Sequence, residues 1–208
     1  MNMKMIRTGF FILAAGALLS TGFAAMMVYN FQLPESALEF KVDSTLHKIE
    51  GKVTAFSIKP LSFDFDKPEL RENIEVTFPV LAMDTGMKAR DAAMYKTFDS
   101  AHYSRVSYKA ATVRCSPETA DRLSCVVPGE LTIRNKTLSV PLHAVIERRG
   151  SALHARGEAK LSLAAFDLHP PSVLGLIKVF DEVTINFDTG WNPASPAAPP
   201  AKEASKPL

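Results

Sequence analysis

The sequence has few of the features that mark an enzyme or a nucleic-acid-binding protein. Lys and Arg number 24 and Asp and Glu number 22, so no basic excess favours a nucleic-acid partner. No Gly-x-Ser-x-Gly, His-Glu-x-x-His or glycine-rich phosphate loop occurs. The five histidines, His47, His102, His143, His154 and His169, have no metal-ligand spacing. We therefore predict no catalytic residues, no metal and no cofactor.

The first residues have the order of a secretory signal. Lys4 and Arg7 precede the apolar run Gly9 to Leu19, and small residues follow up to Ala24. We predict a signal peptide over residues 1–24 and a periplasmic or secreted protein. The alternative is an uncleaved N-terminal membrane anchor, because the uncharged stretch is long enough to span a bilayer.

Cysteine is scarce, since Cys115 and Cys125 are the only two. A metal site would need further Cys or His ligands at short spacing, and none lies nearby. In an exported chain a close pair of cysteines favours a disulfide. We predict a Cys115–Cys125 disulfide that stabilises the fold by roughly 3 kcal/mol.

The last residues lack large side chains. From Asn192 onward the chain is rich in Pro and Ala, and almost nothing in it can build a core. We predict a disordered or extended tail over residues 192–208.

Between Tyr29 and Trp191 apolar and polar residues alternate with a period of two, as in Leu38-Glu-Phe40-Lys-Val42. This alternation is typical of antiparallel strands with one face in water. About eight such runs, separated by turn residues, predict an all-β domain over residues 30–191, either a sandwich or a closed barrel. Residues 85–100 have near-helical spacing instead and predict a short helical insert.

Strand parity conflicts around the cysteines. Cys115 and Cys125 are placed as a hairpin pair, and Leu131 has the same parity in the sequence as Cys125. Tyr108 does not have the parity of Cys115, so the alternation must shift by one residue somewhere. We predict that a β-bulge at Pro128-Gly129 supplies the shift.

Large apolar side chains are concentrated on the predicted inner face. A small barrel can fill its interior with side chains or enclose one apolar ligand, and the pattern alone leaves both open, although such stripes are more often core. The residues that would line a ligand-binding lumen or its insert are Phe40, Phe63, Phe65, Phe78, Met83, Met94, Phe98, Tyr108, Leu131, Ile133, Leu142, Phe166, Leu176, Ile177 and Phe180.

Four landmarks occur in one order: Asp43-Ser-Thr-Leu-His47, Met83-Asp-Thr85, Arg90-Asp91 and Gly129-Glu-Leu131-Thr-Ile133. In this order they resemble the YceI-like family, which comprises exported lipocalin-like barrels associated with polyisoprenoid binding. The resemblance covers about residues 30–191. It implies an eight-stranded antiparallel barrel with a helical insert, and a long apolar pocket for an isoprenoid, quinone or fatty-acyl chain.

The resemblance also suggests roles for particular residues. Thr85, Arg90 and Asp91 match the family's motif, and we expect Arg90 and Asp91 to fix the insert against the barrel rather than to do chemistry. Tyr108 stands where many members have Phe. We expect its hydroxyl to reach a polar head group of the ligand.

Three functions compete at this point. The first is a lipid carrier or sequestering protein, as a monomer or homodimer. The second is a ligand-free module that binds an envelope or membrane-protein partner, and a lumen-filling change such as Gly157→Leu would separate the two. The third is an enzyme acting on a lipid head group through His47, Arg90, Asp91 and Tyr108, which no spacing supports.

Overall fold

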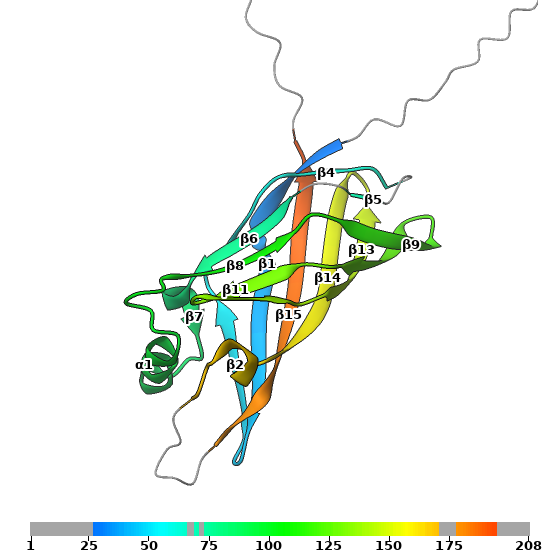
Figure 1. The fold of residues 1–208 in the computed structure, drawn as a ribbon. Helices are drawn as coiled ribbons and strands as arrows, with labels where there is room; N and C mark the ends of the chain where they lie inside the picture. Colours follow the sequence, from blue (N-terminus) through cyan, green and yellow to red (C-terminus); the bar gives the residue numbers. More distant parts are fainter. Residues whose placement is uncertain (1–26, 66–68, 71–72, 171–177, 195–208) are drawn as a thin grey trace, which may run out of the picture.

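The fold is known from a computed structural model that describes residues 27–65, 69–70, 73–170 and 178–194 (Figure 1). These residues form two antiparallel sheets, one α-helix and two 3-10 turns. The first strands are β1 (Met27–Ser44), β2 (Lys48–Val53), β3 (Ser57–Ile58), β4 (Leu61–Phe63), β5 (Glu69–Leu70), β6 (Ile74–Pro79) and β7 (Met83–Asp84). The later strands are β8 (Arg105–Ala110), β9 (Val113–Thr119), β10 (Arg122–Val127), β11 (Glu130–Ile133), β12 (Lys136–Ser139), β13 (Leu142–Arg149), β14 (Ala152–Ser162) and β15 (Val179–Pro193). The turns are η1 (Val80–Ala82) and η2 (Ala164–Phe166), and the helix is α1 (Lys88–Thr97).

The larger sheet has ten strands in the order β5-β9-β10-β13-β14-β15-β1-β2-β7, with β4 paired to β1 outside this path. The smaller sheet has five strands in the order β12-β11-β8-β6-β3. Inward-facing residues of both sheets belong to one apolar cluster. The all-β antiparallel class predicted by the alternation is therefore confirmed.

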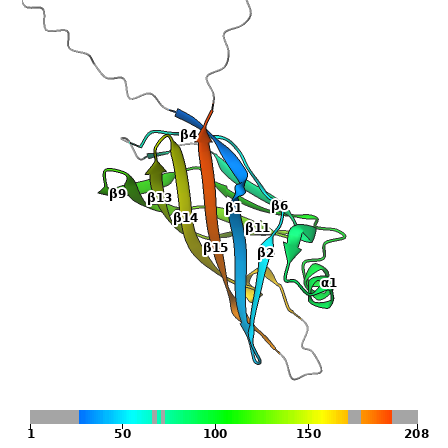
Figure 2. The ribbon, with the colours of Figure 1, turned by 180° about the vertical axis from the view of Figure 1, so that it is seen from behind.

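The long strands β1, β14 and β15 lie side by side and form the centre of the larger sheet (Figure 2). β1 pairs with β15 from Tyr29 opposite Pro193 to Ser44 opposite Val179. The predicted tail therefore begins too early, because Asn192 and Pro193 pair with the start of β1 and belong to a strand. Ala194 follows the strand and donates its backbone N–H to the carbonyl oxygen of Val28 at 2.7 Å. The signal-peptide prediction and the tail prediction for residues 195–208 fall outside the described residues.

The prediction of one closed eight-stranded barrel is wrong for the described residues, because their hydrogen-bonded ladder forms two open sheets. Proline explains part of the division, since it has no N–H to continue a ladder. Pro60 lies between β3 and β4, Pro128 between β10 and β11, and Pro141 between β12 and β13. At each of these three prolines the chain leaves one sheet and joins the other.

The predicted bulge at Pro128-Gly129 is also in the wrong place. Cys125, Val127, Leu131 and Ile133 keep one unbroken alternation, with Cys125, Val127 and Ile133 buried. The alternation shifts at Ala111-Thr112 instead, between buried Ala110 in β8 and buried Val113 in β9. There the chain crosses from the smaller sheet to the larger one, so the two strands need not share a register.

The predicted helical insert is confirmed as α1, which lies beside β7 at one edge of the larger sheet (Figure 1). Tyr95 ties the helix to the strand by donating a hydrogen bond from its hydroxyl to the carbonyl oxygen of Met83, at 2.7 Å. Thr97 is the last residue of the helix, and Phe98 caps it. Most of the helix surface is only partly buried, so the insert covers the fold rather than forming its core.

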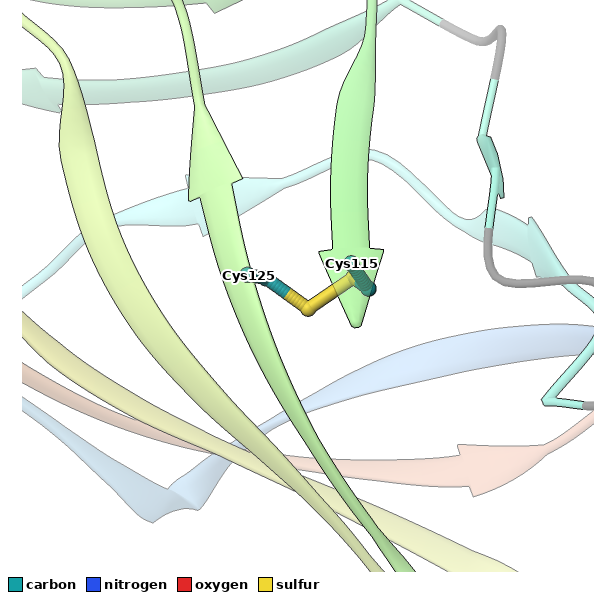
Figure 3. The surroundings of a disulfide bond; sticks show 2 residues. All are labelled: Cys115 and Cys125. Atoms are coloured by element: carbon teal, nitrogen blue, oxygen red, sulfur yellow. A yellow bond between two sulfur atoms is a disulfide. The ribbon is translucent and has the colours of Figure 1, made fainter. Parts of the chain in front are cut away.

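The predicted disulfide joins neighbouring strands β9 and β10 (Figure 3). Cys115 and Cys125 stand directly opposite each other in the ladder, with their Cα atoms 4.0 Å apart. The bond fixes β10 to β9, and β9 pairs with β5 at this edge of the described part of the sheet.

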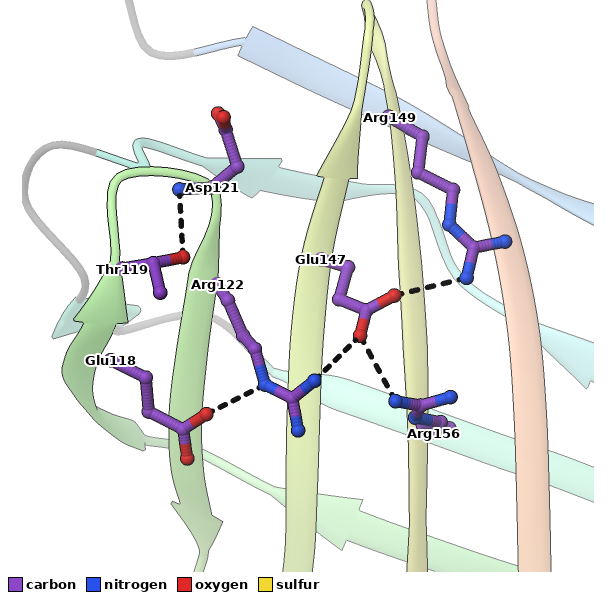
Figure 4. A network of polar contacts seen from close by, with 7 residues as sticks. All are labelled: Glu118, Thr119, Asp121, Arg122, Glu147, Arg149 and Arg156. Carbon is purple, nitrogen blue, oxygen red and sulfur yellow. Dashed lines mark hydrogen bonds and ion pairs between the residues drawn. The ribbon is translucent and has the colours of Figure 1, made fainter.

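Three arginines and two acids form ion pairs on the outer face of this end of the sheet, and Figure 4 shows those around Glu147. Glu147 in β13 accepts hydrogen bonds from Arg122 at 3.1 Å, Arg149 at 2.9 Å and Arg156 at 3.0 Å. Arg122 also pairs with Glu118 at 2.6 Å. One carboxylate therefore connects three arginines from strands β10, β13 and β14.

The hydrogen bond from Arg149, with the charges of Arg156 and Arg122, lowers the pKa of Glu147 below its ordinary value of 4.5. A lowered pKa in the folded state stabilises the fold above the unfolded-state pKa, and this stabilisation disappears as the pH falls through the folded-state pKa. We expect Glu147→Gln to lower the free energy of unfolding at pH 7 and to make little difference well below pH 4. Urea unfolding across this pH range checks the prediction.

The matched control is Glu158→Gln, because Glu158 is exposed on the neighbouring strand and has no ion pair among the described residues. Its effect should be small at every pH. A pH-independent effect of Glu147→Gln would contradict the prediction.

Candidate functional site

The interior between the two sheets is not completely filled. An apolar cavity of about 670 Å³ lies there and is lined by residues from both sheets and from α1. Several lining residues are partly accessible although their strands have neighbours on both sides, and Ala155, Ile146 and Ile185 are examples. Because these side chains line the interior and do not lie on the outer face of the sheet, their accessible surface belongs to the cavity wall.

Most of the residues predicted to line a lumen do line this cavity. They are Phe40, Phe63, Phe78, Met83, Met94, Phe98, Tyr108, Leu131, Ile133 and Leu142. The structure thus brings together side chains from β1, β4, β6, β7, α1, β8, β11 and β13, which alternation alone could assign only to an inner face.

Three predicted residues do not line the cavity. Phe65 follows the end of β4, and its ring lies 4.6 Å from the guanidinium of Arg148. Phe166 is 2% exposed within η2, which packs against β12 and β14, so its ring is ordinary core. Phe180 is 50% exposed, because Val179 and Val183 occupy the inward positions of β15 and leave Phe180 facing out. Leu176 and Ile177 fall outside the described residues.

Sequence reasoning also missed part of the lining. Ile49, Phe56, Leu153, Ile185 and Trp191 line the cavity. Trp191 could have been found by extending the alternation of Ile185 and Phe187 through Thr189. Phe56 had no such signal, because it follows β2 in a non-strand segment and contacts Phe31 at a ring distance of 5.2 Å.

The cavity opens near α1. Four lining residues are exposed. His47, Met87 and Ala89 lie near α1 and mark an opening there, whereas Glu39 belongs to the outer face of the larger sheet. His47 follows β1 in the turn before β2, whereas Met87 and Ala89 belong to the start of the helix. We call the group His47, Met87, Ala89 and Arg90 the mouth.

Polar groups occur at the mouth. Asp91 accepts hydrogen bonds from the backbone N–H of Thr85 at 2.9 Å and from its hydroxyl at 2.6 Å, so Asp91 holds the segment before α1. Arg90 directs its guanidinium to Met87 Sδ at 2.9 Å and to His47 Nε2 at 3.5 Å. The expected anchoring role therefore fits the contacts of Asp91, while Arg90 lies against the cavity.

Tyr108 does not offer its hydroxyl to a ligand as expected. The hydroxyl donates a hydrogen bond to the backbone carbonyl of Val127 at 2.9 Å, in a buried position. Burial raises the pKa of Tyr108, so the phenol remains a donor. The bond joins β8 of the smaller sheet to β10 of the larger sheet.

We expect Tyr108→Phe to lower the free energy of unfolding by about 1–2 kcal/mol, because the buried carbonyl of Val127 loses a partner. Urea denaturation measures the loss. Tyr103→Phe is the matched control, since the Tyr103 hydroxyl has no hydrogen bond to another described residue, and it should change stability by less than about 0.5 kcal/mol. Equal effects of the two changes would contradict the role assigned to the Tyr108 hydroxyl.

A second hollow of about 620 Å³ lies on the outer face of the larger sheet. It is shallower and carries polar side chains, among them His143, Arg156, Glu158 and Asp188. His154 pairs with Asp188 beside it, Nε2 to Oδ1, at 2.9 Å. Its mixed charges fit a solvated strand face.

No group of three or more His, Cys, Asp and Glu side chains is placed to hold a metal ion among the described residues. In the same part of the chain, no helix has the length and apolar character needed to cross a membrane.

The chain is similar to known proteins over most of its length. A family model described as the YceI-like domain matches residues 29–190. Among solved structures, Burkholderia cenocepacia BcnA has a TM-score of 0.62 at 21% identity, and the match covers 77% of this chain and 99% of that one. A polyisoprenoid binding domain from Saccharophagus degradans has a TM-score of 0.63 at 12% identity, with 82% and 100% covered.

A YceI protein of Campylobacter jejuni has a TM-score of 0.57 at 16% identity, with 71% of this chain and 86% of that one covered. No curated protein matches the sequence. At these identities the structural matches establish a shared fold.

Proposed function

Because the chain belongs to the YceI-like domain family, we propose that it binds a long apolar lipid in the cavity between its sheets. The ligand would be an isoprenoid, an isoprenoid quinone or a fatty-acyl chain. The protein would carry or sequester this lipid and would not transform it.

The observation that carries the proposal is the cavity itself. Its volume of about 670 Å³ is within the range of about 300–1,000 Å³ typical of small-molecule sites. Its wall consists almost entirely of aliphatic and aromatic side chains, with polar groups concentrated at the mouth. An unfilled apolar cavity forfeits dispersion contacts, and a lipid chain would restore them.

Two further facts support this function. The Saccharophagus degradans neighbour is itself a polyisoprenoid binding domain. The four residues considered for an enzyme do not form one constellation, because Asp91 is bonded to Thr85 and the Tyr108 hydroxyl is bonded to Val127. Binding without catalysis is the function that these contacts favour.

We also propose that the protein is exported and acts in the periplasm or outside the cell. The N-terminal signal pattern and the Cys115–Cys125 disulfide both fit an oxidising compartment. A ligand-free module that binds an envelope partner is the second candidate, and the polar hollow on the outer sheet face is the surface it would use.

Gentle purification of the full chain from its host, followed by native mass spectrometry and organic extraction, tests the lipid proposal. We expect adducts of lipid mass that disappear on denaturation. A homogeneous ligand-free mass, together with no uptake of added isoprenoid quinone, would overturn the proposal and favour the second candidate.

A further inference from the structure

Arg90 is a charged side chain at the mouth of a mostly apolar cavity. It is partly buried, lines the cavity and comes from the first turn of α1. Its guanidinium forms hydrogen-bond contacts with two described side chains, Met87 Sδ at 2.9 Å and His47 Nε2 at 3.5 Å. Thioether sulfur is a weak acceptor, so neither contact neutralises the charge.

The two acids closest to Arg90 in the sequence, Asp91 and Asp84, are already engaged. Asp91 accepts two hydrogen bonds from Thr85 through one carboxylate oxygen. Asp84 accepts a hydrogen bond from the N–H of Gly86 at 2.7 Å. Both carboxylates shape the segment that leads into α1, and no described carboxylate forms an ion pair with Arg90.

Arginines elsewhere on the described surface are paired differently. Arg122, Arg149 and Arg156 contact Glu147, and Arg148 contacts Asp121 at 2.8 Å. The Arg90 guanidinium differs from these arginines, because it lines the cavity and forms no ion pair with a described carboxylate.

Resting on the function proposed above, we propose that the ligand is an anionic amphiphile whose phosphate or carboxylate head group pairs with Arg90 at the mouth while its apolar chain fills the cavity. A guanidinium presents a planar fork of donors that matches both head groups. The head group remains next to water at the mouth, so its charge need not be fully desolvated. His47, which is exposed beside Arg90, adds a second polar contact.

The test compares two probes that share one chain, farnesyl phosphate and farnesol, by calorimetric titration of the full-length protein at low salt. We expect wild type to bind farnesyl phosphate about tenfold more tightly than farnesol, because one charge-assisted hydrogen bond adds about that much affinity. In Arg90→Gln the ratio of the two dissociation constants should fall close to one. The preference should also weaken as salt is added.

Arg105→Gln is the matched control, because Arg105 is exposed at the start of β8 and lies outside the cavity lining. It should keep the wild-type ratio. If Arg90→Gln does not fold, Arg90→Lys replaces it and should keep a reduced preference, since it keeps the charge but loses the fork.

The outcomes separate the two proposals. Equal affinity of wild type for both probes, or an unchanged ratio in Arg90→Gln, overturns the anionic head group and leaves lipid binding intact. Failure of both probes to bind overturns lipid binding and the head-group inference together.

Discussion

Replacement of Ala155 by phenylalanine is expected to weaken lipid binding on the order of 100-fold while the protein stays folded. Ala155 lies in β14 between two neighbouring strands, and its side chain is partly accessible because it faces the cavity. A phenyl ring there would displace about four chain methylenes. At about 0.8 kcal/mol each, this loss amounts to roughly 3 kcal/mol of binding free energy.

The measurement is displacement of a bound isoprenoid probe, together with thermal unfolding of the ligand-free protein. Filling a cavity with an apolar ring adds buried contacts, so the melting temperature should not fall. Ala152→Phe is the matched control, because Ala152 is in the same strand but outside the cavity lining. A folded Ala155→Phe protein with wild-type affinity would mean that the chain does not enter this cavity.

Gly157 is unsuitable for the same purpose, although it is in the same strand. A Cβ atom at Gly157 would collide with the backbone carbonyl oxygen of His143 and would come within 2.9 Å of Ala144 Cα. Backbone atoms cannot move aside as a flexible side chain can. Gly157→Leu would therefore test whether β13 and β14 can pair at all, and not whether the lumen is filled.

Removal of the disulfide, by Cys115→Ala with Cys125→Ala, is expected to lower the free energy of unfolding by about 3 kcal/mol. The bond closes a loop with a sequence separation of 10, and in the chain-entropy model this restricts the unfolded state by about that amount. For a domain of this size the melting temperature should fall by about 6–12 °C. Thermal unfolding by circular dichroism measures the change.

Reduction provides the control for this prediction. Dithiothreitol should lower the melting temperature of wild type toward that of the double variant and should leave the double variant unchanged. A wild-type protein whose thiols are shown to be free, and whose melting temperature is nevertheless unaltered, would contradict the stabilising role.

The alternation of apolar and polar residues predicted the cavity lining correctly only where a strand continues along the whole segment. Val183 and Ile185 line the cavity because β15 keeps its period of two, and the same period places Phe180 outside. Phe65 has the parity of Phe63, but β4 ends at Phe63 and the parity no longer applies. Pro60, Pro128 and Pro141 show the same limit for the sheets, since a proline signals a break without indicating which sheet the next strand joins.

The amino-acid sequence by itself determined the all-β class, the helical insert, the cysteine pair and most of the apolar wall. Each of these follows from residue type and short-range period, which act between near neighbours in the chain. The tertiary structure decided that the described strands form two open sheets and that a cavity remains between them. It also decided that Arg90 lies at the mouth of this cavity with no ion pair to a carboxylate among the described residues. These features depend on how side chains from distant strands fill a common volume, and no local pattern encodes whether that volume is filled.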